Sequence, residues 1–244
     1  MFYHIGRYFM LMIRVFSKPD KIRIFFKQLI DEIYGLGLGS LGIISIISVF
    51  MGAVIVIQTA SNIDSPLLPL YTVGFTARQS IILEFSPTII ALILAGKIGS
   101  NIASEIGTMR VSEQIDALEI MGVNSANYLV LPKIIASMFI NPFLVIYSMF
   151  LGLFGGWLVG VSTGLCTSYE YIYGIRYDFE MFSVTYALVK TVFFAFVITS
   201  IPAYHGYYTK GGALEVGRSS TKGVVYSSIA VLLTNYVLTQ ILLI

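Results

Sequence analysis

One lysine of this chain lies within an apolar stretch, where a charge is energetically unfavourable. Lys190 falls well inside an apolar stretch that runs from about residue 181 to residue 203. A charged side chain near the centre of a membrane helix costs roughly 2.5 to 3.5 kcal/mol on insertion scales unless it is paired or hydrated. We therefore expect an ion pair with a carboxylate such as Glu84 or Glu105, or a polar cavity that takes a lipid phosphate. Snorkelling to the interface is the alternative, which the depth of Lys190 disfavours.

A second group of charges follows Glu105. Four apolar residues recur at helical spacing: Val111, Ile115, Leu118 and Met121. The positions between them are mostly polar: Arg110, Glu113, Gln114, Asp116 and Glu119. With Gly122 as a terminator, this pattern predicts a short amphipathic helix at about residues 110–122. Such a helix either receives an ATPase partner or lies on the headgroups. Glu105 either transmits that partner's motion or caps its helix and pairs with Lys97 or Arg110.

The elements that position these charges are membrane helices. Of 244 residues, 57% are apolar and 11% are charged, whereas soluble domains carry about 25% charged residues. The mean hydropathy is +0.84. The single Cys166 allows no internal disulfide, and His4 and His205 lie too far apart in sequence for a local metal motif. We expect no cofactor in this chain and no binding of nucleic acid, since the net charge is only +2.

Five apolar stretches predict five membrane-spanning helices, because about 20 apolar residues cross the hydrocarbon core. They lie at about residues 41–58, 84–105, 133–170, 181–203 and 223–244. Asn141-Pro142 interrupts the third stretch, which we interpret as one long, tilted or kinked helix. With a cytoplasmic N-terminus, only Arg78 and Arg176 of the loop cations fall outside. This asymmetry predicts a cytoplasmic N-terminus and, with five spans, a C-terminus on the opposite side of the membrane.

Residues 1–35 are predicted to form an interfacial region, followed by a transmembrane domain of residues 36–244. Six apolar residues repeat at helical spacing: Ile22, Phe25, Phe26, Leu29, Ile30 and Ile33. Ser17, Pro19 and Asp20 are typical of a helix start just before them. We expect an elbow helix that lies in the membrane interface, with packing on another subunit as the alternative. A cleavable signal peptide is disfavoured because Arg14 interrupts the apolar stretch.

Small and aromatic residues suggest how the helices pack. Four glycines repeat at every fourth residue of the third stretch: Gly152, Gly156, Gly160 and Gly164. Such a seam lets another helix approach closely, either of this chain or of a second copy. Tyrosines near the ends of the spans are interpreted as interfacial anchors: Tyr169, Tyr171, Tyr173, Tyr204, Tyr207 and Tyr208.

Two long stretches carry a resemblance to a known family. Residues 84–123 include EIGTMRVSEQIDALEIMGV from Glu105 onward, and residues 188–228 include Lys190, Gly206, Gly212 and Arg218. Both closely resemble the signature of the MlaE/YrbE permeases. Three departures are mild: Ser86 stands for a usual glycine, Lys97 for arginine, and Ser219-Ser220 for Ala-Thr.

The resemblance implies the permease subunit of an ABC transporter that moves phospholipid between the inner membrane and periplasmic carriers, maintaining outer-membrane lipid asymmetry. It implies a homodimer with a phospholipid cavity, cytoplasmic ATPase subunits that bind ATP and Mg, an MCE-domain protein and a STAS-domain protein. Gln58 matches a glutamine that lines the family's lipid site, and Ile55 and Met51 would add apolar surface beside it and Lys190. Core packing is the alternative for these apolar residues.

Two other classes of function compete with a lipid permease. An ion-coupled secondary transporter would use Lys190 and Glu105 as an intramembrane relay. An intramembrane enzyme is weaker, because no Ser-His or Asp-Asp arrangement lies within the spans. Residues 212–219 superficially fit a phosphate-binding loop, but no strand precedes them.

Overall fold

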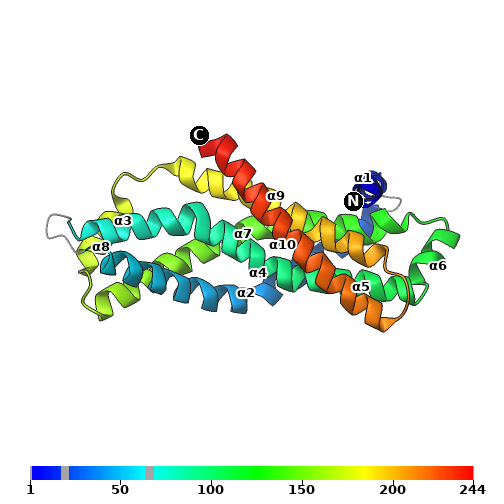
Figure 1. Cartoon of the computed structure of the whole chain (residues 1–244), viewed down its shortest axis with the longest axis horizontal. Coiled ribbons are helices and arrows are strands. Elements are labelled where there is room, and N and C mark those ends of the chain that lie inside the picture. Colours follow the sequence, from blue (N-terminus) through cyan, green and yellow to red (C-terminus); the bar gives the residue numbers. More distant parts are fainter. Residues whose placement is uncertain (1, 18–21, 64–68, 244) are drawn as a thin grey trace. The chain divides into compact units, whose positions relative to one another are not determined.

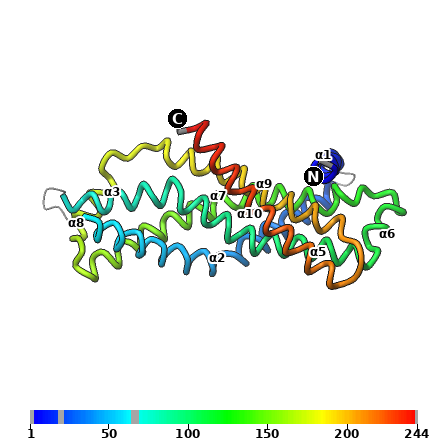
Figure 2. The backbone as a smooth tube through the Cα atoms, in the orientation of Figure 1, coloured from blue at the N-terminus to red at the C-terminus, as the bar shows by residue number. Residues whose placement is uncertain are grey.

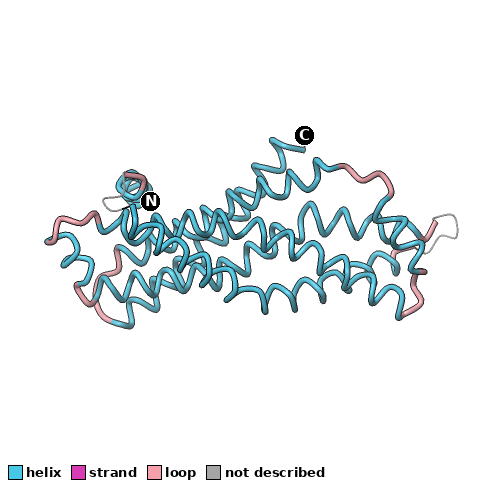
Figure 3. The backbone as a smooth tube through the Cα atoms, turned by 180° about the vertical axis from the view of Figure 1, so that it is seen from behind, coloured by secondary structure: helices cyan, strands magenta, loops and turns pink. Residues whose placement is uncertain are grey.

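The computed structural model describes residues 2–17, 22–63 and 69–243, and within them it is all-α, without a strand (Figure 3). Five helical stretches in these ranges are long and apolar enough to span a membrane, as predicted. The chain divides into two compact units. Unit 1 comprises Met1–Gly39, Ala91–Asn141 and Val192–Ile244, and unit 2 comprises Ser40–Ile90 and Pro142–Thr191.

The N-terminal region holds two helices, α1 (Phe2–Val15) and α2 (Ile22–Ser61). The helix expected at residue 22 is present, but it continues into the first span without a break. Its glycines do not end it; Gly37, for example, lies against Ile140 within unit 1. The separate amphipathic helix is α1 instead, which buries Leu11 and exposes 74% of Ile13. Pro19 and Asp20 lie outside the described residues, and an interfacial position of either helix stays a prediction.

The second span is longer than predicted and is built from five consecutive helical segments. They are α3 (Tyr71–Ser80), the π-helical η1 (Ile81–Ile89), α4 (Ile90–Leu94), the π-helical η2 (Ala95–Gly99) and α5 (Ser100–Val111). Pro87 lies inside η1, where its missing N–H already disturbs regular α-helical bonding. Arg78 therefore belongs to a helix and not to a loop, and it donates hydrogen bonds to the carbonyls of Ile175 and Tyr177 in unit 2.

The predicted short helix after the second span is α6 (Gln114–Ile120), which is shorter than expected. The reason is local: α5 continues to Val111, and Glu113 then adopts a left-handed φ of 61° that separates the two helices. The third span is a single helix, α7 (Ser125–Ser162), that passes through Asn141-Pro142. This confirms one long third helix.

The last part of the chain holds α8 (Ser168–Arg176), α9 (Met181–Tyr207) and α10 (Ala213–Leu243). The sequence analysis missed α8, whose start is fixed by a capping box between Thr167 and Glu170. The last helix begins at Ala213, so most of the apparent phosphate-binding loop is helical.

Each unit has its own packing. In unit 1, α10 lies against α5 and η2 (Figures 1 and 2). In unit 2, α8 lies against α3, and Tyr171 of α8 is fully buried in a core with Val56 and Val73. The prediction of interfacial anchors is wrong for Tyr171, and also for Tyr204 and Tyr207, which are 5% and 4% exposed.

Candidate functional site

The buried lysine of α9 forms an ion pair in unit 2. Lys190 is completely buried, and its Nζ lies 2.9 Å from Oε1 of Glu84 in η1. The predicted ion pair is therefore present, with Glu84 as the partner. The Glu84 side chain is 42% exposed, so the pair is closed on the side of the cation and open on the side of the carboxylate.

Neutral groups hold both members of this pair. Lys190 Nζ also donates to the hydroxyl of Tyr186 at 2.9 Å and approaches the carbonyl of Leu83 at 3.4 Å. Leu83 lies four residues before Pro87, which has no N–H to donate to that carbonyl in an α-helical pattern. Thr88 Oγ1 donates to Oε2 of Glu84 at 3.2 Å. The carbonyl of Leu83 is thus a further acceptor near the buried cation.

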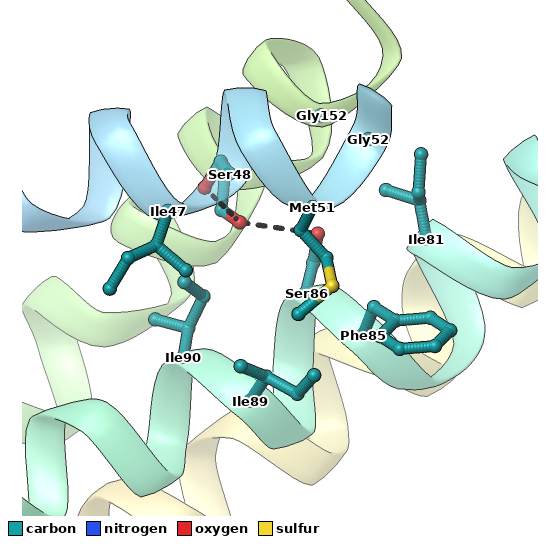
Figure 4. Close-up of a pocket in the computed structure, with 11 residues that line it drawn as sticks. Ile47, Ser48, Met51, Gly52, Ile81, Phe85, Ser86, Ile89, Ile90 and Gly152 are labelled. Carbon is teal, nitrogen blue, oxygen red and sulfur yellow. Dashed lines mark hydrogen bonds between the residues drawn. The ribbon is translucent and has the colours of Figure 1, made fainter. Parts of the chain in front are cut away.

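A small pocket lies beside η1 in the same unit (Figure 4). Met51 of α2 and Phe85 of η1 line it, and one wall carries a chain of serine hydrogen bonds. Ser48 donates to Ser148 at 2.8 Å, and Ser148 donates to Ser86 at 3.2 Å. The cavity volume is about 10 Å³, which is room for about one water molecule. It is too small for an acyl chain.

The four residues predicted to line a lipid cavity do not share one pocket. Met51 lines the small pocket, whereas Ile55 is 6% exposed and belongs to the core of unit 2. Core packing is thus the observed arrangement for Ile55. Gln58 is exposed in the last turn of α2. Lys190 is occupied by Glu84.

The glycine seam meets a helix of the same chain. Within unit 2, a Cβ on Gly156 would lie 2.7 Å from a methyl group of Val56, and one on Gly160 would lie 2.9 Å from Sγ of Cys166. Gly155, which the four-residue pattern omits, faces the backbone of Val49. Gly164 does not belong to the seam: it follows the end of α7 in a turn with φ of 73°, and a Cβ there would meet open space.

Glu105 pairs with Lys133, which was not among its expected partners. Lys133 Nζ lies 2.8 Å from Glu105 Oε2 and 2.5 Å from Glu32 Oε1 within unit 1. The expected partners are engaged elsewhere: Lys97 donates to the carbonyl of Gly39, and Arg110 pairs with Asp116 at 2.6 Å. Lys133 lies inside α7, because this helix begins at Ser125 and not at the predicted residue 133.

One face of α6 packs against the rest of unit 1. Ile115 is fully buried, and Glu119 accepts hydrogen bonds from Ser125 Oγ and from the hydroxyl of Tyr207, both at 2.9 Å. These two bonds hold the pKa of Glu119 below its usual value. Glu113 and Gln114 are exposed. The end of α6 presents Ile120 and Met121, which are 88% and 67% exposed.

Ile120 was not among the apolar residues predicted for this helix, so its exposure at the end of α6 was not expected. Val111 belongs to α5 and Met121 follows the end of α6, so only Ile115 and Leu118 of the four predicted apolar residues lie in α6. The residues predicted to contact the ATPase cluster around the end of α5 and α6: Arg110, Glu113, Gln114, Asp116 and Glu119. Of these, Arg110 and Asp116 pair with each other and Glu119 accepts a hydrogen bond from Ser125, all within unit 1.

Comparison with known proteins agrees with this architecture. Residues 29–241 match the family described as Permease MlaE. A probable ABC transporter permease protein of Rickettsia bellii is 34% identical over 97% of this chain and 91% of its own length. A probable ABC transporter permease protein of Synechocystis is 31% identical over 96% of this chain and 89% of its own length.

A plant relative extends the comparison. The chloroplastic Arabidopsis thaliana protein TRIGALACTOSYLDIACYLGLYCEROL 1 is 30% identical over 90% of this chain and 63% of its own length. The match to the family covers all five apolar helices almost completely. This chain belongs to the MlaE permease family, and it is a multi-pass membrane permease subunit of an ABC transporter.

Proposed function

We propose that this permease moves phospholipid between the inner membrane and periplasmic MCE-domain carriers and so maintains outer-membrane lipid asymmetry. It works as a homodimer, with its N-terminus in the cytoplasm and its C-terminus in the periplasm. ABC permeases work with ATPase subunits, and here these bind ATP and Mg at the cytoplasmic side, with a STAS-domain protein joining them.

The observation that carries the lipid proposal is the half-open ion pair of Lys190 and Glu84. A permanent charge among apolar helices is costly unless a partner or a substrate compensates it. The 42% exposed carboxylate of Glu84 offers a contact to the ammonium group of a phospholipid headgroup. A headgroup whose ammonium group pairs with Glu84 releases Lys190 for its phosphate, so that both charges of the protein keep a partner of opposite sign.

The Arabidopsis relative supports a lipid as the cargo, because its name is that of a glycerolipid, trigalactosyldiacylglycerol. The exposed tip of α6, formed by Ile120 and Met121, supports a protein partner that binds at this helix. Large apolar side chains that protrude from a short polar helix are typical of a protein contact.

The test uses the transporter complex reconstituted in phospholipid vesicles. Phospholipid should stimulate ATP hydrolysis in the natural complex, and ATP should drive lipid transfer to the periplasmic carrier. Lys190→Met should abolish both effects. Lys27→Met, which removes an exposed lysine of α2 in unit 1, is the matched control and should keep them. Stimulation that survives Lys190→Met would reject a role for the ion pair, and absence of ATP-driven transfer in the natural complex would reject lipid transport.

The ion-coupled alternative loses its main support. Its proposed relay needs Lys190 and Glu105 to exchange protons, yet Lys190 pairs with Glu84 and Glu105 pairs with Lys133. Similarity to probable ABC transporter permease proteins also supports ATP as the energy source. Transport by the purified chain alone down an ion gradient would restore this alternative.

A further inference from the structure

A groove in unit 1 shares no residue with the ion pair of Lys190 and is lined by both charged and aromatic residues. Three helices form it: α1, the end of α9 and the beginning of α10. Its cavity volume is about 870 Å³, within the range of about 300–1,000 Å³ that is common for small-molecule sites. None of the residues predicted for lipid binding, ATPase coupling or helix packing lines it.

The groove has defined walls because α1 is fixed to α9. The hydroxyl of Tyr8 donates to Ser200 Oγ at 2.8 Å, and His4 Nδ1 lies 2.9 Å from the hydroxyl of Tyr204. The rings of His205 of α9 and Tyr226 of α10 stack at 5.3 Å with an interplanar angle of 6°. These contacts join the wall of α9 to α1 on one side and to α10 on the other.

The charged groups of the groove are mainly cations. Arg7, Lys210 and Lys222 line it, and among the described residues none of the three forms an ion pair with a carboxylate. The one carboxylate in the lining is Glu215, which is already paired with Arg218 at 2.5 Å. The groove therefore has an excess of positive charge and attracts an anion.

Arg7 is oriented for such a contact. Its guanidinium carbon lies 3.6 Å from the centre of the Tyr208 ring, so the plane of the group is held against an aromatic face. Stacking uses the face of the guanidinium. Its N–H groups remain available to donate hydrogen bonds to the oxygens of a phosphate.

The groove also has apolar walls, which favour a lipid over a free anion. Ile5 and Phe9 of α1 are 44% and 61% exposed and line it. On α10, Tyr226 is 54% exposed, and Ile229 and Leu233 continue the exposed apolar surface along the following turns. In a membrane protein such surface is covered by acyl chains. Cations beside an open apolar surface match a phosphate headgroup with its chains attached.

We propose that this groove binds an anionic phospholipid, with its phosphate at Arg7 and Lys222 and its acyl chains along the exposed apolar residues of α1 and α10. The site is independent of the transported lipid, because it uses none of the residues of the Lys190 ion pair. It gives the permease a preference for a membrane that contains anionic lipid.

Native mass spectrometry of the purified complex tests this proposal. The complex is equilibrated in micelles that contain equal amounts of phosphatidylglycerol and phosphatidylcholine, and the anionic lipid retained per chain is counted. Arg7→Gln combined with Lys222→Gln should lower this retention by on the order of tenfold, because each cation near a lipid surface contributes strongly to the attraction of anionic lipid. Arg7→Lys combined with Lys222→Arg keeps both charges and should keep most of the retention.

Arg14→Gln is the matched control, since it removes an exposed cation from the same helix outside the groove. An equal loss in this control would show general surface attraction and overturn the site. Retention unaffected by the double change would do the same, as would equal retention of phosphatidylcholine. Inorganic phosphate should not displace the lipid; displacement at millimolar concentration would show a site for free phosphate instead.

Lys222→Gln alone decides the matter if the double variant does not fold, because the Lys222 side chain is exposed and makes no ion pair among the described residues. It should lower the retention of phosphatidylglycerol severalfold, and unchanged retention would contradict the proposal.

Discussion

Gly52 of α2 and Gly152 of α7 face each other within unit 2 so closely that no side chain fits between the helices. A Cβ on Gly52 would lie 1.8 Å from the carbonyl oxygen of Gly152. Two backbones in such contact gain dispersion energy and interhelical contacts that larger residues would prevent.

Gly52→Ala should therefore destabilise the permease by about 1–3 kcal/mol or more, because the added methyl group would collide with backbone and not with a movable side chain. Unfolding in detergent, followed by circular dichroism, measures the change. Gly42→Ala is the matched control in the same helix, since a Cβ there meets nothing within 4 Å, and it should be neutral or slightly stabilising. Equal stability of the two variants would contradict the close packing.

The ion pair in unit 2 should respond unequally to removal of its two members. Glu84→Gln leaves the completely buried Lys190 without its carboxylate, which should cost about 2 kcal/mol or more. Lys190→Met leaves Glu84, which is half-exposed, and should cost less than about 1 kcal/mol. Unfolding midpoints of both variants check this order. The reverse order would show that Tyr186 and the Leu83 carbonyl suffice to hold the lysine.

Lys133 should be the most sensitive member of its cluster in unit 1. Lys133→Met leaves the carboxylates of Glu32 and Glu105 near one another with no cation between them, whereas Glu105→Gln leaves the bond to Glu32 intact. We expect Lys133→Met to lower the unfolding temperature clearly more than Glu105→Gln. If Glu105 instead transmits the stroke of the ATPase, Glu105→Gln should leave stability nearly unchanged but lower transport.

Glu119 should make stability depend on pH. Its pKa is held below the ordinary glutamate value of about 4.3 by hydrogen bonds from Ser125 and Tyr207. The native chain therefore binds fewer protons than the unfolded chain in this range, so the contribution is present above about pH 4.3 and is lost as the pH falls through the lowered value. Unfolding midpoints from pH 7 to pH 3 should fall less steeply in Glu119→Gln than in the natural chain. Identical slopes would exclude this residue as a contributor.

The exposed tip of α6 should be needed for the ATPase partner. Ile120→Glu should reduce co-purification of the ATPase and leave the fold intact, because 88% of this side chain is exposed. Asp116 and Glu119 are poorer choices for charge reversal, since Asp116 pairs with Arg110 and Glu119 with Ser125 and Tyr207. Ile13→Glu on α1 is a control with a similarly exposed isoleucine. Undiminished co-purification would place the contact elsewhere.

The number of membrane helices followed from the sequence because hydropathy is a local property. A stretch of about 20 apolar residues must satisfy its own backbone in lipid, and only a helix does so. The same logic predicted one helix at about residues 133–170 despite Pro142, and the structure has one helix at Ser125–Ser162. It also missed α8, although Thr167 and Glu170 stand at the spacing of a capping box, because α8 is too short to produce a hydropathy signal.

The sequence by itself determined the membrane class, the presence of a buried charge at Lys190 and the two motifs of the family. Only the tertiary structure decided which partner each charge has: Glu84 for Lys190, Lys133 for Glu105 and Asp116 for Arg110. Hydropathy and helical periodicity depend on neighbouring residues along the chain. An ion pair across helices depends on which faces meet, and close contacts such as Gly52 with Gly152 set those faces.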